Sequence, residues 1–183
     1  MMEFDWQTFL FYFVLEPLIF LFFFGIAIGW LNEHRKNSVI AVDFDTLVDV
    51  APIIERGKIW AINNNKPFDE YFDAHIVEQT PNPSGLVRAL RYQQLGYTLC
   101  FVSARPERLR IDAARFLNAW KLRGELYMCS NKVPIEELIE HAPAYKQLAY
   151  DEIASNIERK LVGIIDSHSG LKGICKEKRS KKK

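Results

Sequence analysis

The chain has 183 residues, of which 49% are hydrophobic and 13% aromatic, so it can form one domain with a substantial core and little more. Its 24 basic and 23 acidic side chains leave a formal net charge of +1 at pH 7, and its three cysteines have no CxxC spacing. The absence of CxxC spacing argues against a disulfide framework and a zinc site, and unpaired cysteines fit a reducing compartment.

Residues 9–31 form an apolar segment that has the length of one membrane-spanning helix. A cleaved signal peptide and an interfacial segment are the alternatives. A signal peptide needs a basic start, whereas residues 1–8 contain Glu3 and Asp5 and no Lys or Arg. The segment therefore predicts a retained transmembrane helix, preceded by a short N-terminus.

The positive charges predict the orientation of this helix. All 24 Lys and Arg residues follow the apolar segment, so the positive-inside rule places residues 1–8 outside the cell and residues 32–183 in the cytoplasm. Within the segment, Gly25 and Gly29 have GxxxG spacing, which would allow two helices to pack closely. A homo-oligomer through Gly25 and Gly29 is therefore one of the partners to consider.

Residues 39–42 are a short apolar run that leads into two carboxylates, Asp43 and Asp45. Such a run predicts a strand buried on both faces, as at the centre of a parallel sheet. Carboxylates at the C-terminal end of such a strand face the ligand crevice, where they can hold a hard cation or attack a phosphoryl group. The alternative is a strand followed by a solvated acidic turn.

Residues 50–80 have no clean hydrophobic period. Their middle contains three consecutive Asn followed by Lys66 and Pro67, which predicts a turn or loop. We therefore expect an irregular insertion between the first strand and the first regular helix.

A regular helix is predicted at residues 85–95, with Gly96 as its stop. Residues 97–102 are a second buried strand that ends on Ser103, and Pro106 suits the first turn of the following helix. A hydroxyl at such a strand-to-helix junction predicts an anion site, although a simple helix cap is about as common.

The rest of the chain continues the alternation of strands and helices. A short strand is expected at residues 125–129, and residues 133–159 should be largely helical with a break at Pro143. The last strand, residues 161–165, ends on Asp166. At least four strands that alternate with helices predict a parallel α/β sheet. Three strand ends then bring carboxylates and a hydroxyl to one edge of the sheet.

In this order of residues the chain resembles the haloacid-dehalogenase-like (HAD) hydrolases. The family has Asp-x-Asp after the first strand, Ser after the second, a downstream Lys, and Asp after the last strand. More narrowly, residues 102–106 (Val-Ser-Ala-Arg-Pro) and the run from Lys146 to Asp166 look like the phosphatase domain of polynucleotide kinase-phosphatases. The resemblance covers roughly residues 38–175, and no kinase P-loop is present.

This resemblance implies a HAD-like, Rossmann-like domain at residues 32–175 with a small cap insertion at 49–80. One transmembrane helix would precede the domain, and a basic tail at 176–183 would follow it. The implied activity is Mg²⁺-dependent hydrolysis of a phosphomonoester, with a phosphorylated nucleotide or nucleic-acid end as substrate. This domain plan and this activity are expectations from the resemblance.

The resemblance also implies catalytic roles for individual residues. Asp43 would be the nucleophile that forms an aspartyl-phosphate. Asp45 would protonate the leaving oxygen and later deprotonate the attacking water. Lys146 would neutralise charge in the transition state, with Lys132 as the alternative for this role.

The remaining implied residues bind phosphate or metal. Ser103 would donate a hydrogen bond to the phosphoryl oxygens, and Arg105 would extend this anion site toward the substrate. A Mg²⁺ ion would be held by Asp43, the backbone carbonyl of Asp45, and Asp166.

Two positions depart from the family pattern. Leu47 occupies the place of the Thr that follows Asp-x-Asp-x in the family, because Thr46 comes one residue early. Asp166 is followed by Ser167 rather than by a second carboxylate. These departures favour the alternative function, a catalytically degenerate HAD-like module that serves as a membrane-bound binding or scaffold protein.

The last twelve residues, 172–183, contain seven basic side chains against Glu177 alone. Such a charged tail is most often simply solvated. Next to a membrane it could also bind anionic lipid, and nucleic acid is a third partner that it would suit.

Overall fold

The computed structural model describes residues 15–156, 159–166 and 170–172. Its main sheet has the strand order β5-β4-β1-β6-β7, in which the first four strands run parallel and β7 is antiparallel to β6. The strands are β1 (Ser38–Asp43), β4 (Thr98–Pro106), β5 (Gly124–Cys129), β6 (Lys160–Asp166) and β7 (Gly170–Lys172). The expected α/β fold with four parallel strands is therefore confirmed, and β7 is an addition that the sequence pattern does not predict.

Strand β1 lies at the centre of the sheet because its side chains are apolar on both faces. Residues 39–42 are each at most 2% exposed. The strand pairs with β4 on one side and β6 on the other, so Val42 lies opposite both Phe101 and Ile165. This register brings the carboxyl ends of three strands to one edge, at which Asp43 ends β1.

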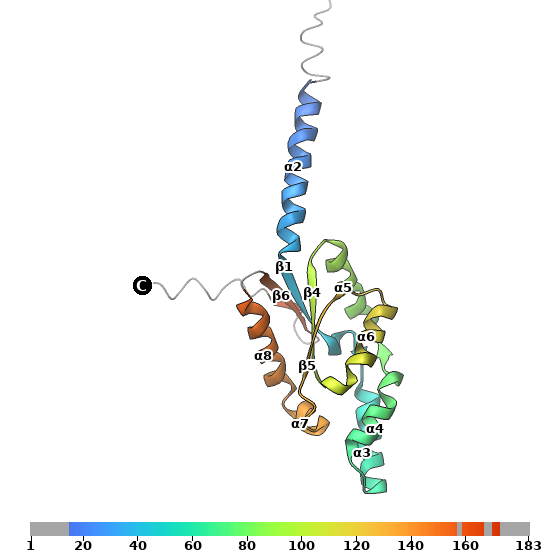
Figure 1. Ribbon diagram of the computed structural model, residues 1–183. Helices are drawn as coiled ribbons and strands as arrows, with labels where there is room; N and C mark the ends of the chain where they lie inside the picture. Colours follow the sequence, from blue (N-terminus) through green and yellow to red (C-terminus); the bar gives the residue numbers. More distant parts are fainter. Residues whose placement is uncertain (1–14, 157–158, 167–169, 173–183) are drawn as a thin grey trace, which may run out of the picture.

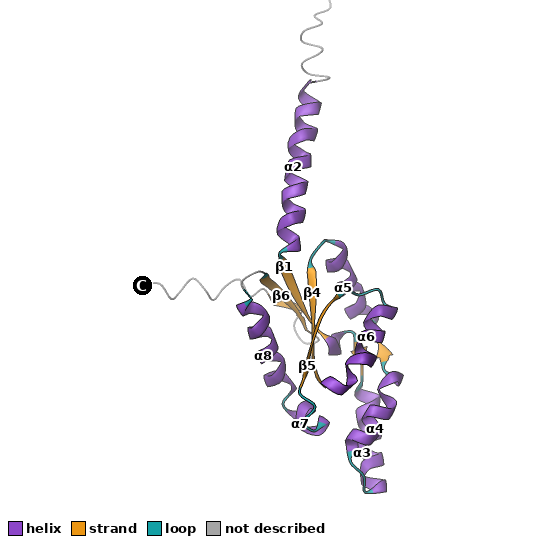
Figure 2. Ribbon diagram, viewed as in Figure 1, coloured by secondary structure: helices purple, strands orange, loops and turns teal. Residues whose placement is uncertain are grey.

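Helices cover both faces of this sheet (Figure 2). The helices α5 (Pro83–Gln94) and α6 (Arg110–Ala119) pack on one face, and α8 (Ala142–Ser155) packs on the other. Helix α5 confirms the predicted helix at 85–95, and it ends as expected before Gly96, which has a φ of +88°. The core is thus a three-layer α/β arrangement in which each face of the sheet has its own apolar cluster.

The expectation of an irregular insertion was wrong, because most of residues 50–80 are helical. Helix α3 (Ala51–Asn64) and helix α4 (Phe68–His75) are followed by the 3₁₀ turn η3 (Ile76–Glu78). They are flanked by the short antiparallel strands β2 (Val48–Asp49) and β3 (Thr80–Pro81). Helix α3 buries only Ile53 and Gly57, which is too little to give a visible apolar period.

The two helices of this insertion pack at the carboxyl end of the sheet. Their apolar cluster contains Ile53, Phe68, Phe72 and Ile76, and it also includes Leu109 and Ile135 from elsewhere in the chain. Ile135 begins helix α7 (Ile135–Glu140), which is separated from α8 by His141, close to the break predicted at Pro143. The insertion and α7 therefore share one apolar cluster, and Figure 1 shows them at the same end of the sheet.

The boundary after β4 also differs from the expectation. The sequence predicts a strand at 97–102 with Pro106 opening a helix, but β4 continues through Pro106. The 3₁₀ turn η4 (Glu107–Leu109) comes next, and α6 begins only at Arg110. Pro106 has φ −68° and ψ 151°, which are extended values that a proline adopts as readily as helical ones. Ser103 therefore lies within a strand and not at a helix start.

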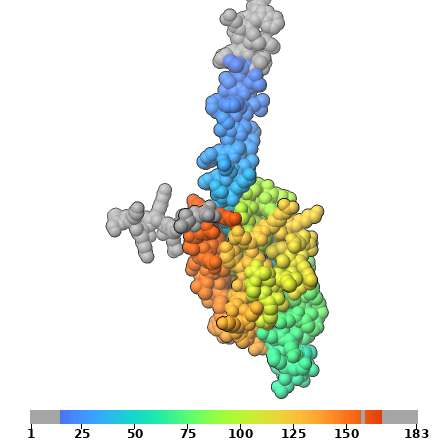
Figure 3. Space-filling model, in the orientation of Figure 1, coloured from blue at the N-terminus to red at the C-terminus, as the bar shows by residue number. Residues whose placement is uncertain are grey.

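Helix α2 (Glu16–Lys36) precedes the sheet and projects from it as a rod (Figure 3). It has no buried residue, and by length and composition it could cross a membrane. The first part of the predicted segment 9–31, up to residue 14, and the basic tail at 176–183 lie outside the described residues. The described helix continues past Leu31, and only Asn37 separates it from β1.

Helix α2 is joined to the domain at the amino edge of the sheet. The Ser38 hydroxyl donates to the His34 carbonyl at 2.9 Å, and the Thr98 hydroxyl donates to the Lys36 carbonyl at 3.1 Å. Figure 1 shows α2 leaving at the end where β1 starts, whereas α3, α4 and α7 lie at the opposite end. The carboxyl edge of the sheet therefore faces away from α2.

Candidate active site

The two carboxylates of the Asp-x-Asp sequence lie in a tight turn at the end of β1. The residues that follow Asp43 form the 3₁₀ turn η2 (Phe44–Thr46), and an Asp43 carboxylate oxygen accepts the backbone N–H of Asp45 at 3.0 Å. The Thr46 hydroxyl donates to the Asp43 carbonyl at 2.6 Å. These two local bonds hold the side chains of Asp43 and Asp45 on the same side of the chain.

Lys146, from helix α8, lies between these carboxylates. Its ammonium nitrogen is 2.8 Å from an oxygen of Asp43 and 2.6 Å from an oxygen of Asp45. The Lys146 side chain is only 13% exposed, whereas Lys132, the alternative, is exposed on the loop after β5. Of the two lysines, Lys146 is the one that contacts the carboxylate pair.

Burial and neighbouring charges separate the pKa values of the two carboxyl groups. Burial, followed by the negative charge of Asp45, raises the pKa of Asp43, although Lys146 partly opposes this. Burial would also raise the pKa of Asp45, but the positive charges of Arg105 and Lys146 outweigh it and lower this pKa. Burial alone would lower the pKa of Lys146, and the two aspartates reverse this and raise it.

Arg105 comes from the end of β4 and is 6% exposed. Its guanidinium group lies 3.5 Å from an Asp45 oxygen and donates to the Gln79 side-chain oxygen at 2.7 Å. The group also lies over the ring of Phe44, 4.6 Å from the ring centroid. Sequence reasoning identified Arg105 but missed Gln79 and Phe44, which hold it, because no local pattern links these positions.

Ser103 is buried beside this group, 3% exposed. Its hydroxyl oxygen accepts the backbone N–H of Arg105 at 3.2 Å, which fixes the direction in which the chain leaves the regular part of β4. Ser103 therefore does not lie at a helix N-terminus, because α6 begins only at Arg110. A hydrogen bond from Ser103 to a bound phosphate stays a prediction.

Asp166 ends β6 at the same edge of the sheet. Because Val42 pairs with Ile165, the next residues along the two strands are Asp43 and Asp166. Tyr150 of α8 lies near both, and burial, followed by the charges of Asp43, Asp166 and Asp45, raises its pKa. Tyr150 is a further side chain near the site that the sequence did not indicate.

The carboxylates of Asp43 and Asp166 are the type of ligand that a magnesium ion binds. Within the described parts of the chain, no group of three or more His, Cys, Asp or Glu side chains could hold a metal by itself. Mg²⁺ is usually held by one or two carboxylates together with water and substrate phosphate, so it does not need such a group. Asp43 and Asp166, at neighbouring strand ends, supply hard oxygen donors of the required type.

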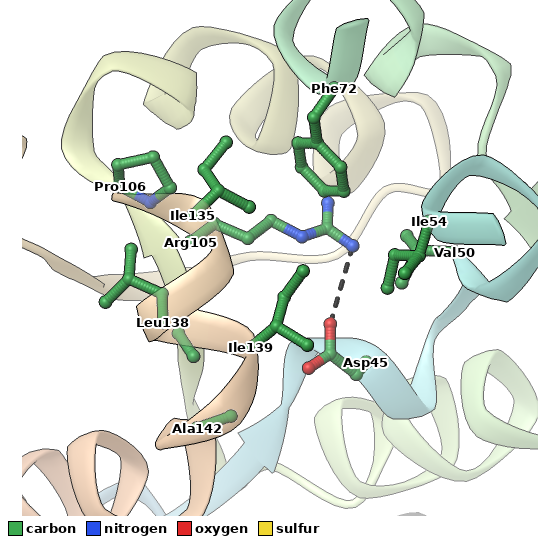
Figure 4. Close-up of a pocket in the computed structure, with 11 residues that line it drawn as sticks. Asp45, Val50, Ile54, Phe72, Arg105, Pro106, Ile135, Leu138, Ile139 and Ala142 are labelled. Carbon is green, nitrogen blue, oxygen red and sulfur yellow. Dashed lines mark hydrogen bonds and ion pairs between the residues drawn. The ribbon is translucent and has the colours of Figure 1, made fainter. Parts of the chain in front are cut away.

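A pocket of about 160 Å³ opens beside Asp45 (Figure 4). Arg105 extends across it toward Asp45, and all its other lining residues are apolar. These residues are Val50, Ile54, Phe72, Ala104, Pro106, Ile135, Leu138, Ile139 and Ala142. The pocket thus lies between the insertion, α7 and the end of β4, and it touches Asp45 but not Asp43.

Comparison with protein-family models, with curated proteins and with solved structures finds no match for this chain. The chemistry of the site must therefore be argued from its geometry. A buried carboxylate, a second carboxylate next to it and a lysine that contacts both form a site suited to nucleophilic attack on a phosphoryl group.

Proposed function

We propose that the protein is a Mg²⁺-dependent phosphomonoesterase that works through an aspartyl-phosphate intermediate. The observation that carries this proposal is the position of Lys146, 2.8 Å from Asp43 and 2.6 Å from Asp45 at the carboxyl edge of the sheet. Phosphoryl transfer spreads negative charge over three oxygens, and a cation at this point stabilises that charge. The phosphorylated nucleotide or nucleic-acid end that the resemblance implies stays a prediction.

The reaction has two steps. An Asp43 oxygen attacks phosphorus, the bond from phosphorus to the ester oxygen breaks, and the leaving oxygen takes a proton from Asp45. Asp45 then takes a proton from water, the water oxygen attacks phosphorus, and the bond from phosphorus to Asp43 breaks. Inorganic phosphate leaves with the proton that Asp45 took from water, so both side chains return to their ionised resting states.

The lowered pKa of Asp45 leaves this group ionised in the resting site, so the proton for the first step must arrive with the substrate. A phosphomonoester has a second pKa of about 6 and carries such a proton below that pH. Its negative charge next to Asp45 also raises the affinity of this carboxylate for the proton. Arg105 limits this rise because it keeps its contact with Asp45.

Asp43, Asp166 and the backbone carbonyl of Asp45 are the groups that would hold Mg²⁺. When bound, the ion would neutralise part of the charge on the phosphoryl oxygens. Lys146 supplies a positive charge between the two carboxylates, and Arg105 supplies a second one next to the pocket. We therefore expect chelation of divalent ions to stop hydrolysis and added Mg²⁺ to restore it.

We predict a bell-shaped pH dependence of kcat/KM for the purified full-length protein. Below the pKa of Asp43 the nucleophile is protonated and the rate falls, and above about pH 6 the free substrate loses the proton that Asp45 needs. In Lys146→Gln the pKa of Asp43 rises further, because the charge that opposes the rise is gone. The acid limb should move to higher pH, and kcat should fall about 10²- to 10³-fold.

The matched control is Lys132→Gln, which removes an exposed lysine outside the carboxylate pair. This variant should keep the acid limb of the wild-type protein. If Lys132→Gln shifted the limb and Lys146→Gln did not, the assignment of the lysine would be wrong.

A second function is favoured by one observation. In the resting site both carboxylates are already neutralised, Asp43 by Lys146 and Asp45 by Lys146 and Arg105. Together with Leu47 in place of the expected Thr, this favours a catalytically degenerate HAD-like domain that binds or organises partners at a membrane. Binding of a phosphomonoester without turnover, in the presence of Mg²⁺, would support this function over the enzyme.

We further propose that α2 anchors the protein in a membrane with the domain on the cytoplasmic side. The large apolar side chains of this helix are exposed, with Phe20 at 67%. Several exposed basic residues lie at or just before the starts of β1, β5 and β6, which is the amino edge of the sheet from which α2 projects, as a membrane-facing surface would require. These residues are Lys36, Lys121, Arg123 and Lys160, next to the partly exposed Trp120.

The anchor predicts that full-length protein sediments with membranes and is released by detergent but not by high-pH wash. Protease added outside intact spheroplasts should leave the domain intact. Recovery in the soluble fraction would contradict the anchor, and digestion of the domain from outside would show the opposite orientation.

The two glycines of α2 leave room for a partner helix. A Cβ added at Gly25 or at Gly29 would meet nothing within 4 Å, so this face of α2 is open to a second copy.

A further inference from the structure

The pocket beside Asp45 has a composition that indicates what it binds. Nine of its eleven lining residues are apolar, and the two charged ones, Asp45 and Arg105, contact each other at 3.5 Å. Arg105 also donates to Gln79. In Figure 4, Ile54, Phe72 and Ile139 surround the space next to this charged pair. An apolar group in the pocket would therefore bury apolar walls without displacing a polar contact.

The chemistry of Asp45 indicates which part of a substrate enters this pocket. In the proposed reaction Asp45 gives its proton to the oxygen of the departing alcohol, so the alcohol must lie on the side of Asp45. The pocket touches Asp45 and does not touch Asp43, the nucleophile on the opposite side of phosphorus. The pocket is thus next to the leaving group and not next to the attacking oxygen.

We propose that the pocket binds the leaving group of the substrate and that this group is a compact apolar alcohol, such as one that carries a single ring. This inference rests on the proposed phosphatase function and defines its substrate class. It differs from the nucleotide or nucleic-acid end that the resemblance implies.

The size of the pocket sets the limit on this group. A dry apolar cavity of about 150 Å³ holds one benzene molecule, and the pocket measures about 160 Å³. A nucleoside is larger than benzene, and sugar hydroxyls placed against these apolar walls would find no hydrogen-bond partner there. A buried hydroxyl without a partner is unfavourable by about 1–3 kcal/mol in proteins. The pocket therefore suits a compact apolar group better than the sugar of a nucleoside.

The test compares three phosphomonoesters with primary alcohols as leaving groups: benzyl phosphate, ethyl phosphate and a nucleoside 5′-monophosphate. Full-length protein in detergent with Mg²⁺ should show a kcat/KM for benzyl phosphate roughly 10- to 100-fold above that for ethyl phosphate. The nucleotide should be hydrolysed more slowly than benzyl phosphate. A higher kcat/KM for the nucleotide, or equal values for benzyl and ethyl phosphate, would overturn the leaving-group assignment while the phosphatase function stood.

A pair of variants tests whether the preference arises in this pocket. Ile139→Phe fills the pocket, so the ratio of kcat/KM for benzyl to ethyl phosphate should fall about tenfold. Ile111→Phe is the matched control, because Ile111 is 64% exposed on α6 and lines no part of the pocket, and it should keep the ratio. Both substrates are assayed on one preparation, so the ratio does not depend on the fraction of folded protein.

An unchanged ratio in Ile139→Phe would overturn the pocket as the origin of the preference. Failure to hydrolyse any of the three esters would overturn the proposed phosphatase function itself, and the leaving-group proposal would fall with it.

Discussion

Replacing Asp43 with asparagine should abolish phosphomonoester hydrolysis, with a loss of at least about 10³-fold in kcat. The amide has nearly the same shape as the carboxylate, but it is neither a nucleophile nor a good magnesium ligand. Asp43 is 3% exposed at the end of the central strand, and its oxygens contact Lys146 and the backbone of Asp45. Asp45, the other carboxylate on Lys146, belongs to the following turn and would act as the proton donor, so it should not replace Asp43 as nucleophile.

The folded state of this variant should be preserved. An ionised Asp43 is buried at a cost, as its raised pKa indicates, and the neutral amide avoids this cost. Lys146 keeps its contact with Asp45. The thermal midpoint should therefore stay close to that of the wild-type protein. Asp151→Asn, at an exposed position of α8, is the matched control and should retain activity. Unchanged turnover in Asp43→Asn would remove Asp43 from the mechanism.

Replacing Gly85 with alanine should destabilise the domain by about 3 kcal/mol. Gly85 lies in α5, and a Cβ at this position would be 1.8 Å from the Thr46 carbonyl oxygen, which is backbone and cannot move aside alone. Helix α5 and the turn that carries Asp45 must separate to make room. The variant should also lose activity, because the Thr46 hydroxyl bonds to the Asp43 carbonyl.

Chemical denaturation of the purified protein measures this effect. Ser84→Ala is the control, since it places alanine at the neighbouring, exposed position of the same helix turn. The control should change the free energy of unfolding by at most about 0.5 kcal/mol. Equal stability of the two variants would show that the close approach of α5 to the Asp43–Asp45 turn is not required for folding.

The elements that the sequence predicts best are those with a strong local signal. The buried strands could be read from short apolar runs, because a strand in the middle of a parallel sheet is apolar on both faces. Asp43 ends the central strand and Asp45 lies in the turn after it, so the prediction of this strand also placed both carboxylates at its carboxyl end.

Contacts between distant positions are what the sequence could not supply. Gln79 and Arg105 are 26 residues apart, and their hydrogen bond depends on how the insertion folds back onto the sheet. The helices of that insertion were missed because α3 buries only Ile53 and Gly57. The helix start predicted at Pro106 was wrong for a different reason. The φ of a proline suits both a helix start and an extended strand.

An aspartyl-phosphate on Asp43 can be trapped during turnover. Full-length protein in detergent is mixed with Mg²⁺ and a radiolabelled phosphomonoester, quenched in acid during turnover, digested and sequenced. We expect a label on Asp43 that hydroxylamine removes and that Asp43→Asn lacks. Phosphate release without labelled protein, or a label on another residue, would contradict it.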